Sequence, residues 1–393
     1  MSRTGRSGPH SSLGIGALAA ILVVGLVGFP SLAQAAPVWS IVASPNPTGS
    51  TGSHLNAASC VSATNCTAVG YYSTSSSKGR ILVEHWNGTS WSIVSTTNPT
   101  GSTAAYLNGV SCNSATYCTA VGYYTTASSP GRTLVERWNG TKWSQVASPN
   151  ASGATGSYLN AVSCTGASNC HAVGYSYNST STNTLAERWN GTSWSVVGSP
   201  NPAGDDRDLQ AVSCSGPANC LAVGYYDATS GSGTTLAERW NGTKWTLVAI
   251  PDPKNSDSYL NGVSCPSSTS CMAVGVTYGS TGPGRALAER WNGSSWAIVA
   301  IPNPAGSGDS YLNDVRCPTT TSCVAVGAYA STSDKTEAQR WNGSTWTVVA
   351  TPNPLGSTGS YLNSLACAST TACYAVGDWH GTGASRTLVE RYS

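Results

Sequence analysis

The sequence carries little charge, and the charge that it has is balanced. Charged residues make up 9% of its 393 residues, and the formal net charge is +2. Removing Arg3 and Arg6, which lie in an amino-terminal segment that we expect to be cleaved, from the 19 basic residues leaves 17, equal to the 17 acidic ones. Nucleic-acid binding needs a concentrated basic surface. The composition therefore argues against a nucleic-acid partner.

Histidine is also scarce, and its placement excludes a zinc site. The five histidines are His10, His54, His85, His171 and His380. None of them recurs beside the cysteines as a ligand set would. Ligand sets for copper or flavin oxidation and a nucleotide-binding loop are missing too. The sequence therefore implies no certain cofactor, apart from the Ca²⁺ considered below.

Long apolar runs are confined to the amino terminus. Residues 13–29 are apolar and follow Arg3 and Arg6, and Ala33-Gln34-Ala35 has the small-x-small form of a signal-peptidase site. We expect residues 1–35 to be a signal peptide that directs the protein to the cell exterior or cell surface. An uncleaved anchor is the alternative, because the run is long for a signal. No other membrane span is expected.

What the sequence does contain is one unit written seven times. Tryptophan precedes Asn-Gly at Trp86, Trp138, Trp189, Trp240, Trp291 and Trp341, and Tyr392 takes the seventh place. These positions are 50 to 52 residues apart, a period that indicates a repeat architecture.

Each unit holds two cysteines at one spacing, C-x5-C. The pairs are Cys60/Cys66, Cys112/Cys118, Cys164/Cys170, Cys214/Cys220, Cys265/Cys271, Cys317/Cys323 and Cys367/Cys373. Paired cysteines in an exported chain are typical of disulfides. We therefore predict seven local disulfides, one in each unit.

Four short strands are predicted in each unit, here for the third copy. Residues 159–164 and 170–175 are β-rich and joined by the C-x5-C pair, as expected for two antiparallel neighbours. Residues 185–189 and 194–197 flank Asn190-Gly191, a strong hairpin signal. A proline-rich connection then leads to the next unit, because proline cannot continue a strand ladder.

The ends of the sequence favour a ring over an open stack. Residues 39–42 look like a fourth strand with no earlier partners, and residues 388–392 like a third strand with no successor. Together they complete one unit, and pairing them removes two exposed edges. The expected fold is all-β: a monomeric, closed seven-bladed β-propeller over residues 36–393, with four antiparallel strands per blade and a closing blade shared by the terminal strands.

In period, strand number and closing blade, residues 37–393 resemble the WD40 and kelch class of β-propellers. The signature residues of those families are missing, since there is no Gly-Gly doublet and no Gly-His with Trp-Asp. The unit itself, V-S-C-x5-C-x-A-V-G with E-R-W-N-G-T-x-W, resembles a repeat of secreted bacterial propellers. The resemblance implies a central channel and two loop-bearing faces, but no inherited activity.

Topology sorts the loops onto two faces. The C-x5-C connections and the Asn-Gly turns should share one face, and the longer, variable connections the other. Two recurring polar sets are interpreted as structural: the acids Glu84, Glu136, Glu187, Glu238, Glu289 and Glu390, and the amides Asn56, Asn108, Asn160, Asn261, Asn313 and Asn363. We expect the acids to be held by donors of a neighbouring blade. The amides should hold backbone groups between blades, or else ring the channel.

Residues that break the repeat are the better functional candidates. Seven aspartates lie in or beside three consecutive connections on the variable face: Asp205, Asp206, Asp208, Asp252, Asp257, Asp309 and Asp314. They could hold Ca²⁺ or accept hydrogen bonds from sugar hydroxyls, or be solvated loop charges. Cations open the third strand of five blades: Arg80, Arg132, Arg285, Lys335 and Arg386.

Blade seven departs alone, with Asp378-Trp379-His380. An aromatic ring beside an acid and an imidazole could form a sugar platform or an acid/base pair. Two functions follow. The first is a non-catalytic protein that binds a glycan, a cell-wall polymer or another protein through the variable face. The second is a carbohydrate-active hydrolase or lyase at the channel mouth. The uniformity of the repeat favours binding.

Overall fold

A computed structural model of the chain describes residues 37–393, apart from residues 230 and 255. The predicted signal peptide, residues 1–35, lies outside the described residues. Pro37–Ser393 form one compact unit. Across the described residues, no helix has the length and apolarity that spanning a membrane requires.

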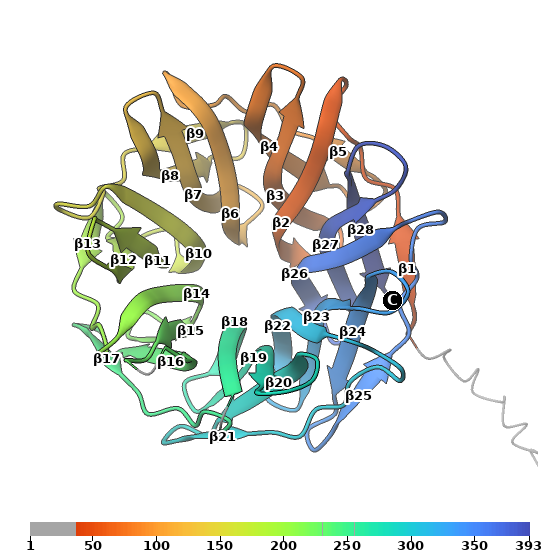
Figure 1. The fold of residues 1–393 in the computed structure, drawn as a ribbon. Coiled ribbons are helices and arrows are strands. Elements are labelled where there is room, and N and C mark those ends of the chain that lie inside the picture. The colour runs from red at the N-terminus through yellow and green to blue at the C-terminus, as the bar shows by residue number, and fades with distance from the viewer. Residues whose placement is uncertain (1–36, 230, 255) are drawn as a thin grey trace, which may run out of the picture. The chain divides into compact units, whose positions relative to one another are not determined.

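The described residues form 28 β-strands in seven groups of four (Figure 1). We call these groups blades. Blade 1 comprises β2 (Ser50–Ser62), β3 (Asn65–Thr74), β4 (Ser77–Trp86) and β5 (Trp91–Ile93). Blade 2 comprises β6 (Ser102–Ser114), β7 (Tyr117–Thr126), β8 (Ser129–Trp138) and β9 (Trp143–Val146). Blade 3 comprises β10 (Gly156–Gly166), β11 (Asn169–Tyr177), β12 (Thr182–Trp189) and β13 (Trp194–Val197).

The remaining blades follow the same order. Blade 4 comprises β14 (Asp205–Gly216), β15 (Asn219–Asp227), β16 (Gly233–Trp240) and β17 (Trp245–Leu247). Blade 5 comprises β18 (Ser256–Ser267), β19 (Ser270–Gly279), β20 (Arg285–Trp291) and β21 (Trp296–Ile298). Blade 6 comprises β22 (Ser310–Thr319), β23 (Ser322–Tyr329), β24 (Lys335–Trp341) and β25 (Trp346–Val349). Blade 7 comprises β26 (Gly359–Ser369), β27 (Ala372–His380), β28 (Arg386–Tyr392) and β1 (Trp39–Val42).

Every blade is an antiparallel sheet, and the strands nearest the centre are β2, β6, β10, β14, β18, β22 and β26 (Figure 1). The last blade is built from both ends of the described chain: β1 pairs with β28, and Trp39 lies opposite Tyr392. The predicted sharing of this blade by the terminal strands is therefore confirmed. The inner strands are longer than predicted. Their first residues, which are rich in Ser and Thr, also pair with the end of the second strand, near the loop that joins the second and third strands.

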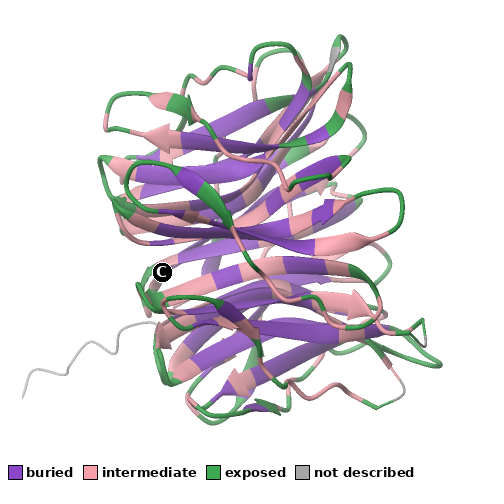
Figure 2. Ribbon diagram, turned by 90° about the vertical axis from the view of Figure 1, so that its left-hand side faces the viewer, coloured by how far each residue is buried: buried purple, intermediate pink, exposed green. Residues whose placement is uncertain are grey.

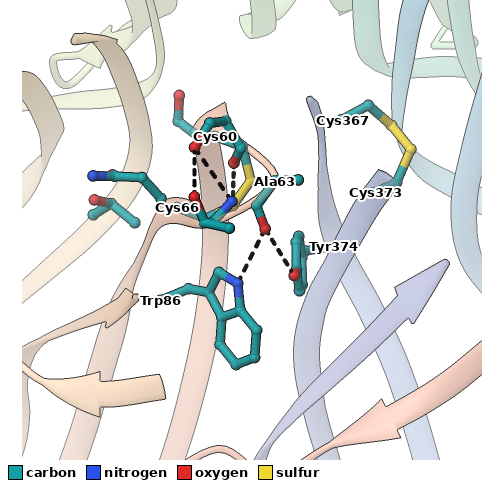
Figure 3. The surroundings of a disulfide bond; sticks show 12 residues. Cys60, Ala63, Cys66, Trp86, Cys367, Cys373 and Tyr374 are labelled. Atoms are coloured by element: carbon teal, nitrogen blue, oxygen red, sulfur yellow. Dashed lines mark hydrogen bonds between the residues drawn. A yellow bond between two sulfur atoms is a disulfide. The ribbon is translucent and has the colours of Figure 1, made fainter. Parts of the chain in front are cut away.

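All seven predicted disulfides are present, each joining the two cysteines of one C-x5-C pair. Cys60 lies directly opposite Cys66 at the end of the hairpin between β2 and β3, with 4.0 Å between their Cα atoms. Beside this hairpin, the carbonyl oxygen of Ala63 accepts hydrogen bonds from Trp86 Nε1 and Tyr374 Oη, both at 3.2 Å (Figure 3). The disulfide loop of blade 1 is thus tied to its own blade and to blade 7.

The hydrophobic core is divided among the seven interfaces between blades. Each cluster combines residues of two adjacent blades. In one cluster Trp86 and Trp91 of blade 1 pack with Tyr374 and Val376 of blade 7. The prediction that the tryptophan pairs supply the core between blades is confirmed, and large aromatic rings provide apolar area that this Gly- and Ser-rich chain otherwise lacks.

The second cysteine of every pair also belongs to this core, a position that the sequence did not indicate. These cysteines are at most 3% exposed, and each is a member of one of the seven clusters: Cys66, Cys118, Cys170, Cys220, Cys271, Cys323 and Cys373. The cause is that the second strand packs against a neighbouring blade, where a disulfide sulfur is buried as readily as an apolar side chain. Each disulfide therefore joins a hairpin to the core between two blades.

Candidate functional site

The connections lie at the two ends of the strands, where the exposed residues gather (Figure 2). The disulfide hairpins and the Asn-Gly turns share one end: a Cβ atom on Gly88, in the turn after β4, would lie 2.9 Å from the Thr64 side chain in the hairpin before β3. We call this end the staple face. The other end, the variable face, carries the loops between second and third strands and the connections between blades. The sequence-based sorting of the loops is therefore confirmed.

A polar channel of about 450 Å³ lies between the inner strands. The six recurring asparagines line it, with Gln210 in the place of the seventh. Each asparagine is the extra residue of a β-bulge: Leu159 pairs with Gly174 and Ala161 with Val173, so Asn160 has no cross-strand partner. A bulge re-aims a side chain, and here it turns the amide towards the next blade.

Each of these amides donates to a leucine carbonyl of the next inner strand. In chain order the bonds are Asn56 to Leu107 at 2.9 Å, Asn108 to Leu159 at 3.0 Å, Asn160 to Leu209 at 3.1 Å, Asn261 to Leu312 at 3.0 Å, Asn313 to Leu362 at 3.0 Å and Asn363 to Leu55 at 3.0 Å. Both sequence-based interpretations of the asparagines therefore hold, since they hold the neighbouring backbone and line the channel as well.

Two of the candidate aspartates face this channel region rather than a loop. Asp208 is buried and accepts hydrogen bonds from Asn160 Nδ2 and Gln210 Nε2, both at 2.8 Å. Burial raises the pKa of Asp208 to about 7. Asp314 is buried too, and its Oδ2 accepts from Ser364 Oγ at 2.8 Å and lies 3.4 Å from Arg316 Nη2. Both carboxyls therefore accept hydrogen bonds from side chains of the inner strands and hold neighbouring inner strands together.

Asp252 also has a structural partner. Its Oδ1 accepts a hydrogen bond from the backbone nitrogen of Thr235 at 3.1 Å. Asn150 and Asn201 accept the same bond at the corresponding places in blades 2 and 3. Asp252 therefore replaces a recurring asparagine that fixes the start of the third strand.

The other four candidate aspartates, Asp205, Asp206, Asp257 and Asp309, are exposed on the variable face. Asp257 Oδ1 accepts from Gly233 N at 3.2 Å and Asp309 Oδ1 from Gly284 N at 2.6 Å. Within the described ranges, no group of three or more His, Cys, Asp or Glu residues is arranged to hold a metal ion. The seven aspartates thus divide between structural and surface positions.

The cations that open the third strands behave as surface groups. Arg80, Arg132, Arg285 and Arg386 are exposed, and Lys335 is half-buried. The Arg386 guanidinium lies 6.0 Å from the Trp379 ring centroid, a spacing at which a cation is attracted to an aromatic face. These side chains lie on the variable face, at the start of the third strands.

The blade-seven triplet gains a partner that the sequence did not reveal. Asp378 is buried between two histidines: its Oδ1 lies 3.2 Å from His54 Nδ1, and its Oδ2 lies 3.1 Å from His380 Nε2. Ser385 Oγ lies 3.0 Å from His380 Nδ1. His54 comes from blade 1, so only the contact between the first and last blades could disclose it. Trp379 stays half-buried beside them.

Sequence reasoning also missed a continuous series of aromatic side chains on the variable face, which we call the aromatic arc. It comprises Tyr361, His380, His54, Tyr71, Tyr106, Tyr123, Tyr158 and Tyr175. Neighbouring ring centroids along this series are 4.7 to 6.3 Å apart. From His54 to Tyr175, stacked pairs within a blade alternate with edge-to-face contacts between blades. The signal was present in the repeated Tyr before Leu-Asn and the repeated Tyr after Val-Gly.

Part of the arc borders a groove of about 750 Å³ over blades 1 to 3, which we call the tyrosine groove. Its lining combines aromatic rings with hydroxyl groups and one cation: Ser76, Lys78, Thr103, Ala104, Tyr106, Tyr123, Thr125, Pro130, Tyr158 and Tyr175. The four tyrosines are half-buried, so each ring presents part of its surface to solvent. Such a lining offers apolar faces and hydrogen-bonding groups together.

The cysteines take no part in the channel or the groove. The buried second cysteines Cys118, Cys170, Cys323 and Cys373, like the other members of the seven pairs, are absent from the lining of both. Their sulfurs are held in disulfides, and no cysteine among the described residues is free. The disulfides are therefore structural, and they supply no nucleophile or metal ligand to the site.

The loops of the preceding blade hold the tyrosine rings in place. The Tyr106 ring packs against Gly79, and its hydroxyl donates to the Lys78 carbonyl oxygen at 3.4 Å. Tyr158 packs in the same way against Gly131 and donates to the Pro130 carbonyl oxygen at 3.1 Å. A Cβ atom on either glycine would collide with the ring. The rings are therefore positioned before any ligand arrives, which lowers the entropic cost of binding.

Burial, and then the neighbouring tyrosines, raise the pKa of Tyr123 to about 12. Burial is also the first cause of the raised pKa of Tyr106 and Tyr175. These hydroxyls remain protonated at neutral pH and can both donate and accept hydrogen bonds. The groove itself is uncharged apart from Lys78.

No family model matches the chain, and no curated protein is similar to it in sequence. Among solved structures it is similar to YCF48 from Cyanidioschyzon merolae, with a TM-score of 0.53 and 14% identity over 90% of this chain and 98% of that chain. It is also similar to a polysaccharide lyase, PL25 ulvan lyase, with a TM-score of 0.53 and 9% identity over 87% of this chain and 97% of that chain. At these identities the similarity is one of fold, and the repeated four-stranded sheets are propeller-like.

Proposed function

We propose that this protein is an exported, non-catalytic glycan-binding protein that holds its ligand in the tyrosine groove. The observation that carries the proposal is the aromatic arc, because partly exposed rings offer flat apolar surfaces for sugar rings while nearby hydroxyls can bond the sugar hydroxyls. The polysaccharide lyase among proteins of similar fold agrees with a carbohydrate ligand. Seven disulfides support a location outside the reducing cytosol.

The proposal includes a closed seven-bladed ring as the scaffold. Its support is that blade 7 contacts blade 1 through the same elements that join other neighbours: a hydrophobic cluster, the bond from Asn363 to Leu55, and backbone pairing of Gly52 with Ser385. A closed scaffold fixes His54 of blade 1 beside blade 7, and so makes the aromatic arc continuous.

Glycan binding is tested by titrating cell-wall polysaccharides and an array of oligosaccharides with the disulfide-intact protein. The double variant Tyr106→Ala/Tyr158→Ala removes two of the four aromatic rings that line the groove. Two lost stacking contacts should raise the Kd at least tenfold. Tyr278→Ala, which removes a partly exposed ring of blade 5 outside the groove, is the matched control. Equal binding by all three proteins, with unchanged thermal unfolding, would overturn the proposal.

A second candidate function rests on the cluster of His54, Asp378 and His380. An acid shared by two imidazoles, at one end of a row of aromatic rings, has the groups that proton transfer during polysaccharide cleavage needs. The test is to incubate the protein with the polysaccharides that it binds and to follow new reducing ends and unsaturated products. Turnover that is lost in His380→Ala, with binding retained, would establish an enzyme. Binding without turnover would leave the non-catalytic function in place.

A further inference from the structure

Acidic residues are distributed unevenly along the chain. Between residues 37 and 204 the acids are Glu84, Glu136 and Glu187. All three are buried inside their sheets, with at most 3% of each residue exposed. Every aspartate comes later in the sequence. The variable face of blades 1 to 3 therefore presents no carboxylate of its own to solvent.

Exposed cations occupy this acid-free part of the face. Lys78 lines the tyrosine groove, and Arg80 and Arg132 directly follow the two glycines on which Tyr106 and Tyr158 rest. Both arginines are exposed. At the other end of the aromatic arc lie Arg386, His54 and His380. Two acids are present there: Asp378, buried between the two imidazoles, and Asp334, which accepts a hydrogen bond from the Tyr361 hydroxyl.

The opposite part of the same face has the reverse character. Blades 4 to 6 expose Asp205, Asp206, Asp257 and Asp309, and the pKa of Asp227 is raised by burial and then by the charges of its aspartate neighbours. A raised pKa caused by nearby carboxylates is the mark of a negative local field. The continuous aromatic arc does not extend over these acid-bearing blades. Tyr225, Tyr259 and Tyr278 form a separate series of ring contacts there, together with the exposed Arg285 and the acids. On blades 1 to 3, by contrast, aromatic rings and exposed cations occur without an exposed carboxylate.

We propose that the tyrosine groove selects a polysaccharide that carries negative charge on its sugar units, such as carboxylate or sulfate groups. This inference rests on the proposed function, because it names the ligand class of the same groove. Sugar rings stack on Tyr106, Tyr123, Tyr158 and Tyr175, while Lys78, Arg80 and Arg132 attract the charged substituents. The absence of exposed carboxylates avoids the repulsion that would weaken such a ligand.

The probes are an oligogalacturonate of about eight sugars and its methyl ester, which has the same backbone without charge. We expect the acid to bind at least about tenfold more tightly than the ester in low salt, and the difference to shrink on going from about 0.05 to 0.5 M salt, since screening weakens exposed charge pairs. A sulfated dextran oligosaccharide and its unsulfated parent distinguish sulfate from carboxylate as the favoured group.

The charge variant is Lys78→Gln/Arg80→Gln/Arg132→Gln, and its control is Arg285→Gln/Lys335→Gln, which changes equivalent strand positions in blades 5 and 6. The first should lose the preference for the charged probes, so that it binds acid and ester with similar affinity, while the second should retain the preference. If Tyr106→Ala/Tyr158→Ala weakens both probes but the charge variant weakens neither, glycan binding stands and charge selection is overturned. If no probe binds, charge selection is overturned, while the titration with cell-wall polysaccharides decides glycan binding by itself. Equal affinity for single-stranded DNA of matched charge would also overturn selection of a polysaccharide.

Discussion

At the scale of single residues, each blade buries a carboxyl or an amide at one place in its third strand. Three of these carboxyls accept a hydrogen bond from a serine of the connection that enters their blade: Glu84 from Ser44 at 2.8 Å, Glu187 from Ser148 at 2.7 Å and Glu238 from Ser199 at 2.8 Å. This confirms, for these three, that donors of a neighbouring blade hold the acid. A reaction centre is not needed to explain the set.

The same place in blades 5 and 6 has no serine partner. Ile250 and Ile301 take the serine's position in the entering connections. Neither carboxyl oxygen of Glu289 has a hydrogen-bond partner among the described residues, and Glu289 is fully buried. Blade 6 carries Gln339 instead, whose Nε2 donates to the Pro302 carbonyl oxygen at 2.7 Å. A neutral amide there avoids an unpaired buried charge.

We expect Glu289→Gln to stabilise the protein in a pH-dependent way. Burial, and then the charge of Asp252, raise the pKa of Glu289 from 4.5 to about 8. The folded state thus binds this proton more tightly than the unfolded state, so the associated stability is complete below about pH 4.5 and is lost as pH rises towards about 8. The variant should gain on the order of 2 kcal/mol at about pH 8.5 and little at about pH 4.5.

Thermal unfolding at the two pH values measures this difference. The reciprocal variant Gln339→Glu places a second buried carboxyl beside Glu337, whose Oε1 now accepts from Gln339 Nε2 at 2.6 Å. It should lower the Tm most at the higher pH. A Tm difference between Glu289→Gln and the parent that stays the same at both pH values would contradict the assignment of a buried, protonated carboxyl.

At the scale of elements, the inner strand and its partner are shaped by one bulge in every blade. The bulge presses the carbonyl oxygen before the leucine against the second strand, where each copy has the glycine of Ala-Val-Gly. A Cβ atom on Gly174 would collide with the carbonyl oxygen of Tyr158, and the other six glycines are in the same situation. The glycine is therefore required by close approach of two backbones.

Gly174→Ala should destabilise the protein by about 1–3 kcal/mol, because the β10 backbone must move to admit a methyl group in a packed interior. Urea unfolding measures the change. Gly198→Ala is the control, since no atom lies within 4 Å of a Cβ atom built there. If both variants unfold at the same urea concentration as the parent, the bulge is not the reason for the glycine.

Strands, disulfides and the sides taken by the loops could be predicted from the sequence because they rest on local patterns. Cysteine spacing placed Cys60 opposite Cys66, and Asn190-Gly191 placed the turn before β13. Contacts between blades could not be predicted. His54 and Asp378 are 324 positions apart in the sequence, and the tyrosines resemble ordinary strand residues until the ring geometry aligns them.

Burial could not be read from the sequence either. Asp208 and Asp314 were assigned to a loop site, although both are buried beside the channel. The spacing of Cys112 and Cys118 predicted their bond, but not that Cys118 is 3% exposed in the core between blades 1 and 2. In each case the neighbouring blade supplies the covering atoms, and a single repeat does not show where that neighbour lies.

At the scale of the whole molecule, stability is shared among seven similar interfaces rather than held in one core. Blade 7 differs from the others in its connectivity, since its outer strand β1 comes from the beginning of the described chain. Trp39 of β1 is buried against Tyr392, with ring centroids 5.2 Å apart. The pairing of β1 with β28 therefore joins the two ends of the described part of the chain.

A protein that begins at residue 43, compared with one that begins at residue 37, should expose the edge of β28 and lack the buried Trp39 side chain. We expect a loss of about 3 kcal/mol or more, together with association through the free strand edge. Size-exclusion chromatography and thermal unfolding measure both effects. In the control, Ser40→Ala/Ile41→Ala changes outward side chains and keeps the strand. A truncated protein with the size and Tm of the parent would show that closure does not depend on β1.

The asparagine bonds around the channel all run in one direction, from each blade to the one that follows. A blade with this asparagine therefore has two unlike sides, a donating side and an accepting side. Blade 4 is the exception, since its Gln210 donates to Asp208 of its own strand. An in-frame duplication of one asparagine-bearing unit would meet complementary neighbours on both flanks. Addition or loss of such units thus preserves the hydrogen bonds between blades, and the angle through which each blade turns limits how many units can complete the circle.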